Sequence, residues 1–467
     1  MSTGSNWNET MNPLAMITER MQQRSRAAAI YWRGWEYSYG DFWPMVLNWE
    51  SRFPGLGVAT GSVCAFLGEY SPQVCALVFA LMRRGTILVP FTPVVQGEMP
   101  GLMEIAGVEL LFRFSDDDAW TCERPACAQN ALVSSFAAHG RSGLVVFTSG
   151  STGRPKGILH DCERVLRKFV DERAGWRTVM FLMLDHFGGF NTLISTFAYG
   201  GTAVCLPDRN PDTVCRVIQE SQATLLPATP TFINLLLASN TFRQHDLSSI
   251  RLITYGTEVM PAATLERLRE AFPNAALKQT YGLSELGVLR SKSESDSSLW
   301  VKIGGTGFET RVVDNLLWIR SEANMVGYLN EKSPFDADGW MCTGDCVEVR
   351  GEYLKILGRD SEMINVGGQK VFPAEVENVL MQAGNISAAR VFGVRHPLMG
   401  NVVHAEVSLL LQEQAQTMKE RLRLFCFGRI AKFKIPVRFS VVDEGAGCSP
   451  RFKKIRPQAS VDPKEGC

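Results

Sequence analysis

Residues 144–159 read LVVFTSGSTGRPKGIL, a short apolar run followed by a loop rich in glycine and hydroxyl side chains. The run 144–147 predicts a buried strand, and the glycines after it allow positive φ and close approach to a ligand. Backbone N–H groups, hydroxyl donors and the cations of Arg154 and Lys156 together suit phosphate oxygens. The stretch therefore predicts a phosphate-binding loop.

The spacing of this loop differs from that of the P-loop ATPases. In the G-x-x-x-x-G-K-[ST] pattern the lysine follows the last glycine and precedes a serine or threonine. Here Lys156 precedes Gly157, and Ile158 follows that glycine. A flexible linker is the alternative interpretation. It is disfavoured because a linker requires neither the preceding strand nor the Pro155-Lys156 pair.

Length and charge narrow the classes of protein to which the chain can belong. A chain of 467 residues exceeds what one hydrophobic core usually holds, so we expect two or three domains. The 48 basic residues equal the 48 acidic ones, so no overall field attracts nucleic acid or an anionic membrane. The apolar run 74–82 is too short to span a bilayer, and residues 1–11 show no signal-peptide pattern. We expect a cytoplasmic protein with no nucleic-acid or membrane partner.

The twelve cysteines are scattered and include no C-x-x-C pair. Cys342 and Cys346 have neither a second pair nor a nearby histidine to complete a zinc site. Reduced thiols, typical of the cytoplasm, are the better interpretation.

Strands alternate with helices in the first part of the chain. We expect a strand at 63–67, a helix that begins at Ser71-Pro72 and ends at Gly85, and a strand at 86–90. An amphipathic helix is expected at 161–172, a strand at 181–186, and polar surface loops at 115–128 and 291–298. This alternation predicts a large α/β domain with mainly parallel sheets.

Polar residues follow the expected strands where glycines turn the backbone. His186 leaves its strand just before Gly188, which suits a ligand pocket, although core packing is as common for a lone histidine. Strand 252–255 leads into Gly256, Thr257 and Glu258. Strand 277–281 ends in Tyr281, Gly282, Leu283, Ser284 and Glu285. Tyrosine offers a flat apolar face and glutamate a ligand for a hard cation, whereas in isolation Glu285 would be read as a solvated acid.

From Asp360 the pattern changes to that of a second, smaller domain. Residues 363–377 read MINVGGQKVFPAEVE, which predicts a strand, a turn at Gly367-Gly368 and a helix that starts near Pro373. Expected strands at 389–394 and 402–407, and a helix at 416–429, complete an α+β unit of three strands and two helices.

These motifs, in this order, resemble those of the adenylate-forming superfamily, which contains acyl- and aryl-CoA synthetases, luciferases and peptide-synthetase adenylation domains. The resemblance covers nearly the whole chain. It implies a large domain over 1–358 that binds ATP and a carboxylate, and a small C-terminal domain over 359–467 that rotates. It also implies ATP, Mg²⁺ and coenzyme A as cofactors.

The resemblance assigns roles to the motifs of the large domain. The turn Gly256-Thr257-Glu258 borders adenine, Tyr281 stacks on it beside Gly282 and Ser284, and Glu285 holds the magnesium. His186 and Gly188 lie beside the carboxylate substrate. The phosphate loop consists of Thr148, Ser149, Gly150, Ser151, Thr152, Gly153 and Lys156.

Other motifs resemble those that bind ribose and the pantetheine arm. Asp345 is expected in a turn, where its carboxylate could accept hydrogen bonds from both ribose hydroxyls. The alternative is that it only forms an ordinary Asx turn. The resemblance gives Arg359 a contact with ribose or phosphate oxygens and places the hinge at Ser361. It also places Gly367 and Gly368 against the pantetheine arm.

Residues 449–456 read SPRFKKIR and resemble a terminal motif that normally contains Gly-Lys followed by Ile or Leu. Lys454 falls on the catalytic lysine of that motif, and Lys453 replaces the usual glycine. Without the resemblance, this basic cluster would be read as solvated.

The expected reaction is ATP-dependent activation of a small-molecule carboxylic acid to an acyl-adenylate, with release of pyrophosphate, and transfer to the thiol of coenzyme A. The absence of a Ser-His-Asp or Cys-His signature fits, because no protein nucleophile is needed. One alternative is a stand-alone adenylation enzyme that loads a phosphopantetheine carrier protein. Another is a degenerate member that binds nucleotide without catalysis. A monomer or a homodimer is expected.

Overall fold

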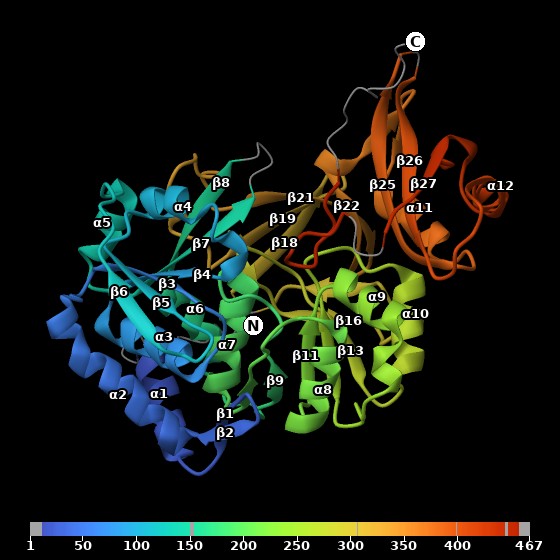
Figure 1. The fold of residues 1–467 in the computed structure, drawn as a ribbon. Coiled ribbons are helices and arrows are strands. Elements are labelled where there is room, and N and C mark those ends of the chain that lie inside the picture. The colour runs from blue at the N-terminus through green and yellow to red at the C-terminus, as the bar shows by residue number, and fades with distance from the viewer. Residues whose placement is uncertain (1–11, 150–153, 306, 398, 444–446, 457–467) are drawn as a thin grey trace, which may run out of the picture.

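The computed structural model describes residues 12–149, 154–305, 307–397, 399–443 and 447–456. This part of the chain forms two large α/β sheets, an antiparallel sheet and a small α+β unit that stands apart from them (Figure 1). The expected fold class, a large α/β region followed by a small α+β region, is confirmed.

One α/β sheet carries the phosphate-loop strands. Its inner strands are parallel, and antiparallel strands flank them on both sides. The strand order is β20 (Gly327–Tyr328), β8 (Pro155–Asp161), β7 (Gly143–Ser149), β4 (Ile87–Phe91), β3 (Val63–Leu67), β5 (Leu110–Phe114) and β6 (Trp120–Glu123). Its outer face packs against α4 (Met99–Ala106) and α5 (Ala131–Ala137).

The other α/β sheet is parallel except for its last pair. The strand order is β13 (Ala276–Gln279), β12 (Leu252–Tyr255), β11 (Leu225–Ala228), β9 (Arg177–Val179), β10 (Thr202–Val204), β1 (Ala28–Trp32) and β2 (Trp35–Ser38). Its outer face packs against α8 (Pro211–Ser221), α9 (Pro230–Ser239) and α10 (Ala262–Ala271).

A shared hydrophobic core joins the inner faces of both sheets. Phe79 and Phe197, from two helices of this layer, pack with ring centroids 5.1 Å apart. The expected helix 72–82 is confirmed: Ser71 caps its first turn, and Gly85 ends it at a φ of 72°. The helices of the layer are α1 (Pro13–Gln23), α2 (Tyr39–Leu56), α3 (Pro72–Arg84), α6 (Cys162–Leu166) and α7 (Phe187–Ala198).

An antiparallel sheet follows in the order β16 (Ser291–Ser293), β17 (Val301–Ile303), β22 (Tyr353–Arg359), β21 (Met341–Arg350), β19 (Leu316–Ser321) and β18 (Phe308–Val313). A short hairpin of β14 (Gly282–Leu283) and β15 (Gly287–Val288) precedes it. Asp345 lies within β21, opposite Arg359, so its expected place in a turn was wrong. Gly344, at a φ of 74°, bends the strand without ending its pairing.

The C-terminal unit contains β23 (Ile364–Val366), β24 (Gln369–Val371), β25 (Ile386–His396), β26 (Gly400–Leu409), β27 (Arg438–Val441), α11 (Pro373–Leu380) and α12 (Ala415–Cys426). Its sheet therefore has five strands where three were expected. The additional strands, β24 and β27, are short and polar on one face, so they carry little sequence signal. The unit contacts α10, where the backbone N–H of Ala262 donates to Asn378 at 2.8 Å.

Four further expectations differ from the structure. The strand expected at 181–186 is absent, because β9 ends at Val179 and the chain turns before α7. The helix expected at 161–172 is cut short, because its first residue ends β8 and α6 stops at Leu166. The two expected surface loops contain β6 and β16, which pair at sheet edges. Among the residues placed by the structure, no helix has the length and apolar character needed to cross a membrane.

Candidate functional site

Candidate residues gather where parallel strands β11, β12 and β13 end. Thr229 follows β11, Gly256 follows β12, and Tyr281 lies two residues after β13. Ligands of open α/β sheets bind at this carboxyl edge. A side chain at Gly256 would approach within 2.5 Å of the Thr280 hydroxyl oxygen, and Thr257 next to it takes a φ of 70°. The expected glycine turn is therefore tightly packed.

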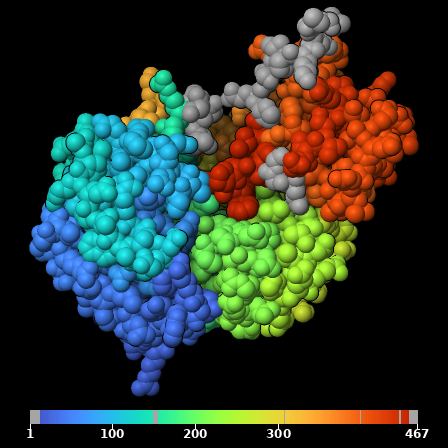
Figure 2. All heavy atoms as spheres, in the orientation of Figure 1, coloured from blue at the N-terminus to red at the C-terminus, as the bar shows by residue number. Residues whose placement is uncertain are grey.

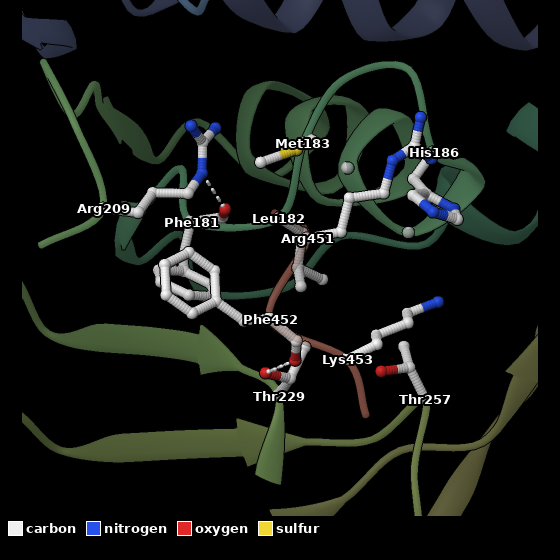
Figure 3. A pocket seen from close by; sticks show the side chains of 12 residues that line it. Phe181, Leu182, Met183, His186, Arg209, Thr229, Thr257, Arg451, Phe452 and Lys453 are labelled. Atoms are coloured by element: carbon white, nitrogen blue, oxygen red, sulfur yellow. Dashed lines mark hydrogen bonds between the residues drawn. The ribbon is translucent and has the colours of Figure 1, made fainter. Parts of the chain in front are cut away.

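A cavity opens beside this edge, between the large region and the C-terminal segment 447–456 (Figure 3). Apolar side chains form much of its lining, and His186, Gly188 and Thr257 also line it. The C-terminal segment supplies Arg451, Phe452 and Lys453. In Figure 2 the red surface of this part of the chain lies between the two lobes of the large region.

Phe452 packs into the apolar side of the cavity. Its ring lies 5.5 Å from that of Phe181 and 5.4 Å from that of Phe232, measured between centroids. Its carbonyl accepts a hydrogen bond of 2.7 Å from the Thr229 hydroxyl. The cavity wall is thus shared by residues far apart in sequence.

His186 occupies the N-cap position of α7 without a capping hydrogen bond from its side chain, and it is half-buried. Burial lowers its pKa well below the usual range, and the nearby cations of Lys453 and Arg451 lower it further. The imidazole is therefore neutral near pH 7. A neutral ring can donate or accept a hydrogen bond at the cavity, but it brings no charge.

Asp185, the neighbour of His186, is a buried carboxylate. It accepts a hydrogen bond of 2.8 Å from the Thr92 hydroxyl and pairs with Arg451 at 2.9 Å. Burial raises its pKa, and Arg451 opposes that rise. The resolved contacts therefore make Asp185 part of an ion pair with the C-terminal segment.

Tyr281, Asp345 and Arg359 form a connected group. The Tyr281 hydroxyl donates to the Asp345 carboxylate at 2.5 Å, and Arg359 lies 3.1 Å from the other carboxylate oxygen. Burial raises the pKa of Asp345, whereas Arg359 and the Tyr281 hydrogen bond act to lower it. The structure thus brings together three residues that the sequence placed in one site.

Glu285 and Lys156 are linked through Tyr328. The Tyr328 hydroxyl donates to the Glu285 carboxylate at 2.7 Å, and the Lys156 ammonium lies 5.3 Å from the Tyr328 ring centroid. Lys156 also lies 3.7 Å from the Glu331 carboxylate. Within the described ranges, no lysine or arginine lies within 4.0 Å of Glu285. Its carboxylate therefore remains available to a cation.

The phosphate loop is described only at its edges. Thr148 and the backbone of Ser149 belong to β7, and Lys156 belongs to β8. The remaining loop residues named from the sequence, Gly150, Ser151, Thr152 and Gly153, lie outside the described residues.

Glu258 and Ser284 hold parts of the site in place. The Glu258 carboxylate accepts 2.6 Å hydrogen bonds from the Thr231 hydroxyl and from the backbone N–H of Lys454. The Ser284 carbonyl lies 2.6 Å from a ring nitrogen of buried His160. Gly282 begins β14, where a side chain would approach the Gly287 carbonyl oxygen within 2.7 Å.

The two adjacent lysines of the terminal motif have different surroundings. The Lys454 ammonium pairs with the buried carboxylate of Glu377 at 2.8 Å. Burial alone would raise the pKa of Glu377, but Lys454 and Arg456 outweigh it and lower that pKa. The Lys453 side chain instead lines the cavity.

Gly367 and Gly368 lie away from this cavity, at the exposed turn between β23 and β24. Both take positive φ, at 56° and 86°. A side chain built at Gly368 would meet no atom within 4 Å. One built at Gly367 would come within 3.4 Å of the terminal methyl carbon of Met399, so only Gly368 faces open space.

Several residues of the site were not identified from the sequence. They are Thr229, Tyr328 and Glu377, the ion pair of Asp185 with Arg451, and Phe452 as part of the cavity lining. A signal existed for Thr229, because it ends a parallel strand at the ligand-binding edge. The others depend on contacts between distant segments, for which the sequence holds no local pattern.

Family models match most of the chain. The model described as AMP-binding enzyme matches residues 17–329, and that described as AMP-binding enzyme C-terminal domain matches residues 375–446. The indoleacetate–CoA ligase of Aromatoleum aromaticum is 29% identical, with 88% of this chain and 90% of that protein covered.

A second relative is matched over a smaller share. The 3-[(3aS,4S,7aS)-7a-methyl-1,5-dioxo-octahydro-1H-inden-4-yl]propanoyl:CoA ligase of Rhodococcus jostii is 30% identical, and the chain spans 61% of its length. Among solved structures, the anthranilate CoA ligase AuaEII in complex with anthranoyl-AMP superimposes with a TM-score of 0.81. That comparison covers 94% of this chain and 95% of the other, at 22% identity, and supports the fold.

Proposed function

This chain belongs to the AMP-binding enzyme family, and we propose that it is an AMP-forming acid–thiol ligase that activates a carboxylic acid with ATP and transfers it to coenzyme A. The observation that carries the proposal is the position of the C-terminal segment. The Lys453 side chain lines the cavity together with His186, and the backbone N–H of Lys454 donates to Glu258. A cation at this point suits a reaction between an acid and a phosphate.

We assign the nucleotide to the carboxyl edge of the β11–β13 strands. Tyr281 provides a face for adenine, with Gly256, Thr257, Glu258, Gly282 and Ser284 around it. Asp345 and Arg359 would bind ribose, since the buried carboxylate can accept hydroxyl hydrogen bonds and the guanidinium can donate.

The phosphates are assigned to Thr148, Ser149, Lys156 and the loop between them. Glu285 fits a magnesium ion, because it is an oxygen donor without a cationic partner in the described structure. When bound, the ion would neutralise phosphate charge. Tyr328 orients the Glu285 carboxylate, and Lys156 adds a fixed positive charge nearby.

The acid is assigned to the cavity beside His186 and Gly188. Its carboxylate oxygen attacks the α-phosphorus of ATP, and the bond to pyrophosphate breaks with its electrons leaving on pyrophosphate. We assign the cation of this step to the terminal motif, in which Lys454 falls on the position of the catalytic lysine and Lys453 stands next to it. Positioning and charge stabilisation of this kind are the main sources of catalysis in phosphate transfer.

In the second step a thiol attacks the carbonyl carbon of the acyl-adenylate, and AMP leaves. We propose that the small domain, 359–467, turns about Ser361 between the two steps, so that Gly367 and Gly368 approach the pantetheine arm. The exposed position of both glycines is compatible with such a movement. A cytoplasmic location and a monomeric or homodimeric state stay predictions.

A screen of acids tests the proposal. Pyrophosphate release would be measured with ATP, Mg²⁺ and one of benzoate, phenylacetate, indole-3-acetate or octanoate, because the cavity walls are largely apolar. The best acid is then assayed with coenzyme A and, separately, with a phosphopantetheinylated carrier protein. Acid-dependent release and a coenzyme A thioester are expected. Transfer to the carrier protein alone would favour the carrier-loading alternative, and no release with any acid would contradict the proposal.

A further inference from the structure

Two adjacent lysines occupy the place where the terminal motif usually has one. Their ammonium groups lie in different surroundings. Lys454 pairs with Glu377 of α11, and Arg456 reaches the same carboxylate at 3.0 Å. The side chain of Lys454 is therefore engaged with the small domain, in a buried pair that must break before it could reach the cavity.

The backbone on both sides of Lys453 is fixed to the large region. The Phe452 carbonyl accepts from Thr229 at 2.7 Å, and the Lys454 N–H donates to Glu258 at 2.6 Å. A turn supports this geometry, because the Ser449 N–H donates to the Lys453 carbonyl at 2.7 Å. These contacts set the direction of the Lys453 side chain.

That direction leads into the cavity. Figure 3 shows the Lys453 side chain extending between His186 and Thr257. Its ammonium forms no ion pair within 4.0 Å among the residues that the structure places. Burial lowers the pKa of Lys453, and Glu258 opposes that shift. The two other cations of the lining are paired, Arg451 with Asp185 and Arg209 with Glu69. Lys453 is thus the cation of the lining that has no ion-pair partner among the described residues.

We propose that Lys453 is a catalytic residue whose ammonium binds the carboxylate of the acid during adenylate formation, while Lys454 anchors the terminal segment to Glu377. This assignment rests on the proposed function. A carboxylate bound there would supply the partner that Lys453 lacks, and the ammonium would stay close to the oxygen that attacks phosphorus. The lysine keeps its proton throughout, since the electrons of the broken bond leave on pyrophosphate.

Three variants of the full-length protein separate the two lysines. Lys453→Met and Lys454→Met each remove one charge at similar length, and Lys453→Arg keeps it. Lys434→Met is the matched control, because Lys434 pairs with Glu375 elsewhere on the small domain. Each would be assayed for pyrophosphate exchange with the best acid of the panel above, and for thioester formation from its synthetic acyl-adenylate and coenzyme A.

Lys453→Met should lose about 100-fold in exchange, as for loss of one group that stabilises developing charge. Its KM for the acid should rise while its KM for ATP stays unchanged, and thioester formation should persist. Lys453→Arg should retain exchange. In the wild type, exchange should fall at high pH as Lys453 loses its proton, and arginine should abolish that fall because it stays charged.

Full exchange by Lys453→Met together with its loss in Lys454→Met would overturn the assignment, as would equal losses in the two variants. If Lys453→Met failed to fold, by circular dichroism, the pH profiles of the wild type and Lys453→Arg would decide: identical profiles would overturn it. Absence of exchange by the wild type with every acid would contradict the proposed function, and this assignment with it.

Discussion

The guanidinium of Arg451 lies 2.9 Å from the carboxylate of Asp185, which joins the C-terminal segment to the loop that carries His186. The two residues are 266 positions apart in the chain. Asp185 is almost completely buried, so its charge depends on this partner. The ion pair therefore couples a loop that lines the cavity to the position of the terminal segment.

Replacement of Arg451 should make stability depend more strongly on pH. In Arg451→Ala the pKa of Asp185 rises further, because the opposing cation is gone. A carboxyl group whose folded pKa is raised stabilises the fold at low pH and loses that contribution as the pH rises through the folded pKa. The loss in melting temperature relative to wild type should therefore be larger at pH 8 than at pH 5.

A second substitution provides the control for this prediction. Asp185→Asn combined with Arg451→Ala removes the titrating group, so the double variant should lack the additional pH dependence of the single variant. If the single and double variants showed the same dependence, Asp185 would not be its source.

Substitution of Glu285 by Gln should weaken magnesium-dependent use of ATP, because a neutral amide is a poorer ligand for a hard dication. We expect a higher Mg²⁺ concentration for half-maximal pyrophosphate release and a lower maximum rate. Tyr328→Phe is the matched control, since it removes the hydroxyl that bonds Glu285 but keeps the carboxylate. It should have the smaller effect, and an unchanged Mg²⁺ requirement in Glu285→Gln would contradict the metal role.

The ribose role of Asp345 can be tested with altered substrates. Asp345→Asn should raise the KM for ATP about tenfold, which corresponds to about 1.4 kcal/mol. Wild type should discriminate against 2′-deoxy-ATP and 3′-deoxy-ATP, whereas the variant should discriminate less. Asp336→Asn, which alters an exposed ion pair with Arg311, serves as control. Equal discrimination by Asp345→Asn and wild type would rule out the contact with ribose.

Gly368→Leu should preserve acid-dependent pyrophosphate exchange and lose thioester product. The added side chain meets open space in the described arrangement but would obstruct a pantetheine arm in the thioester-forming one. Gly351→Leu is a close control, because it also has positive φ, at 59°, and nothing within 4 Å. Both variants carry about 1–2 kcal/mol of backbone strain. If the thioester yield fell equally in Gly368→Leu and Gly351→Leu, backbone strain would explain the loss and the contact of Gly368 with the pantetheine arm would be contradicted.

Much of the fold could be predicted because its signals are local. The helix over α3 has its cap, its apolar run and its final glycine within one short stretch, and the structure confirms all three. The glycine turn after β12 was also placed correctly, whereas the turn expected at Gly188 and Gly189 lies just before them, because both glycines belong to α7.

The rest depends on distant contacts. Whether Lys453 or Lys454 faces the cavity is set by the φ of 53° at Phe452 and by hydrogen bonds to Thr229 and Glu258. The strand at 181–186 was expected because residues 181–184 are apolar. In the structure this segment forms a turn before α7, and several of its side chains line the cavity. Asp345 was expected in a turn, although pairing with strands on both sides keeps its segment in the sheet.

The packing of Phe452 against Phe181 and Phe232 has a practical meaning for protein engineering. In a hybrid that joined this large region to the C-terminal part of a relative, residues of the relative would replace Phe452 and its neighbours in the cavity lining. Its preference among acids should then shift even though every large-region residue was retained. Libraries aimed at new substrates should therefore vary Phe452 together with Phe181.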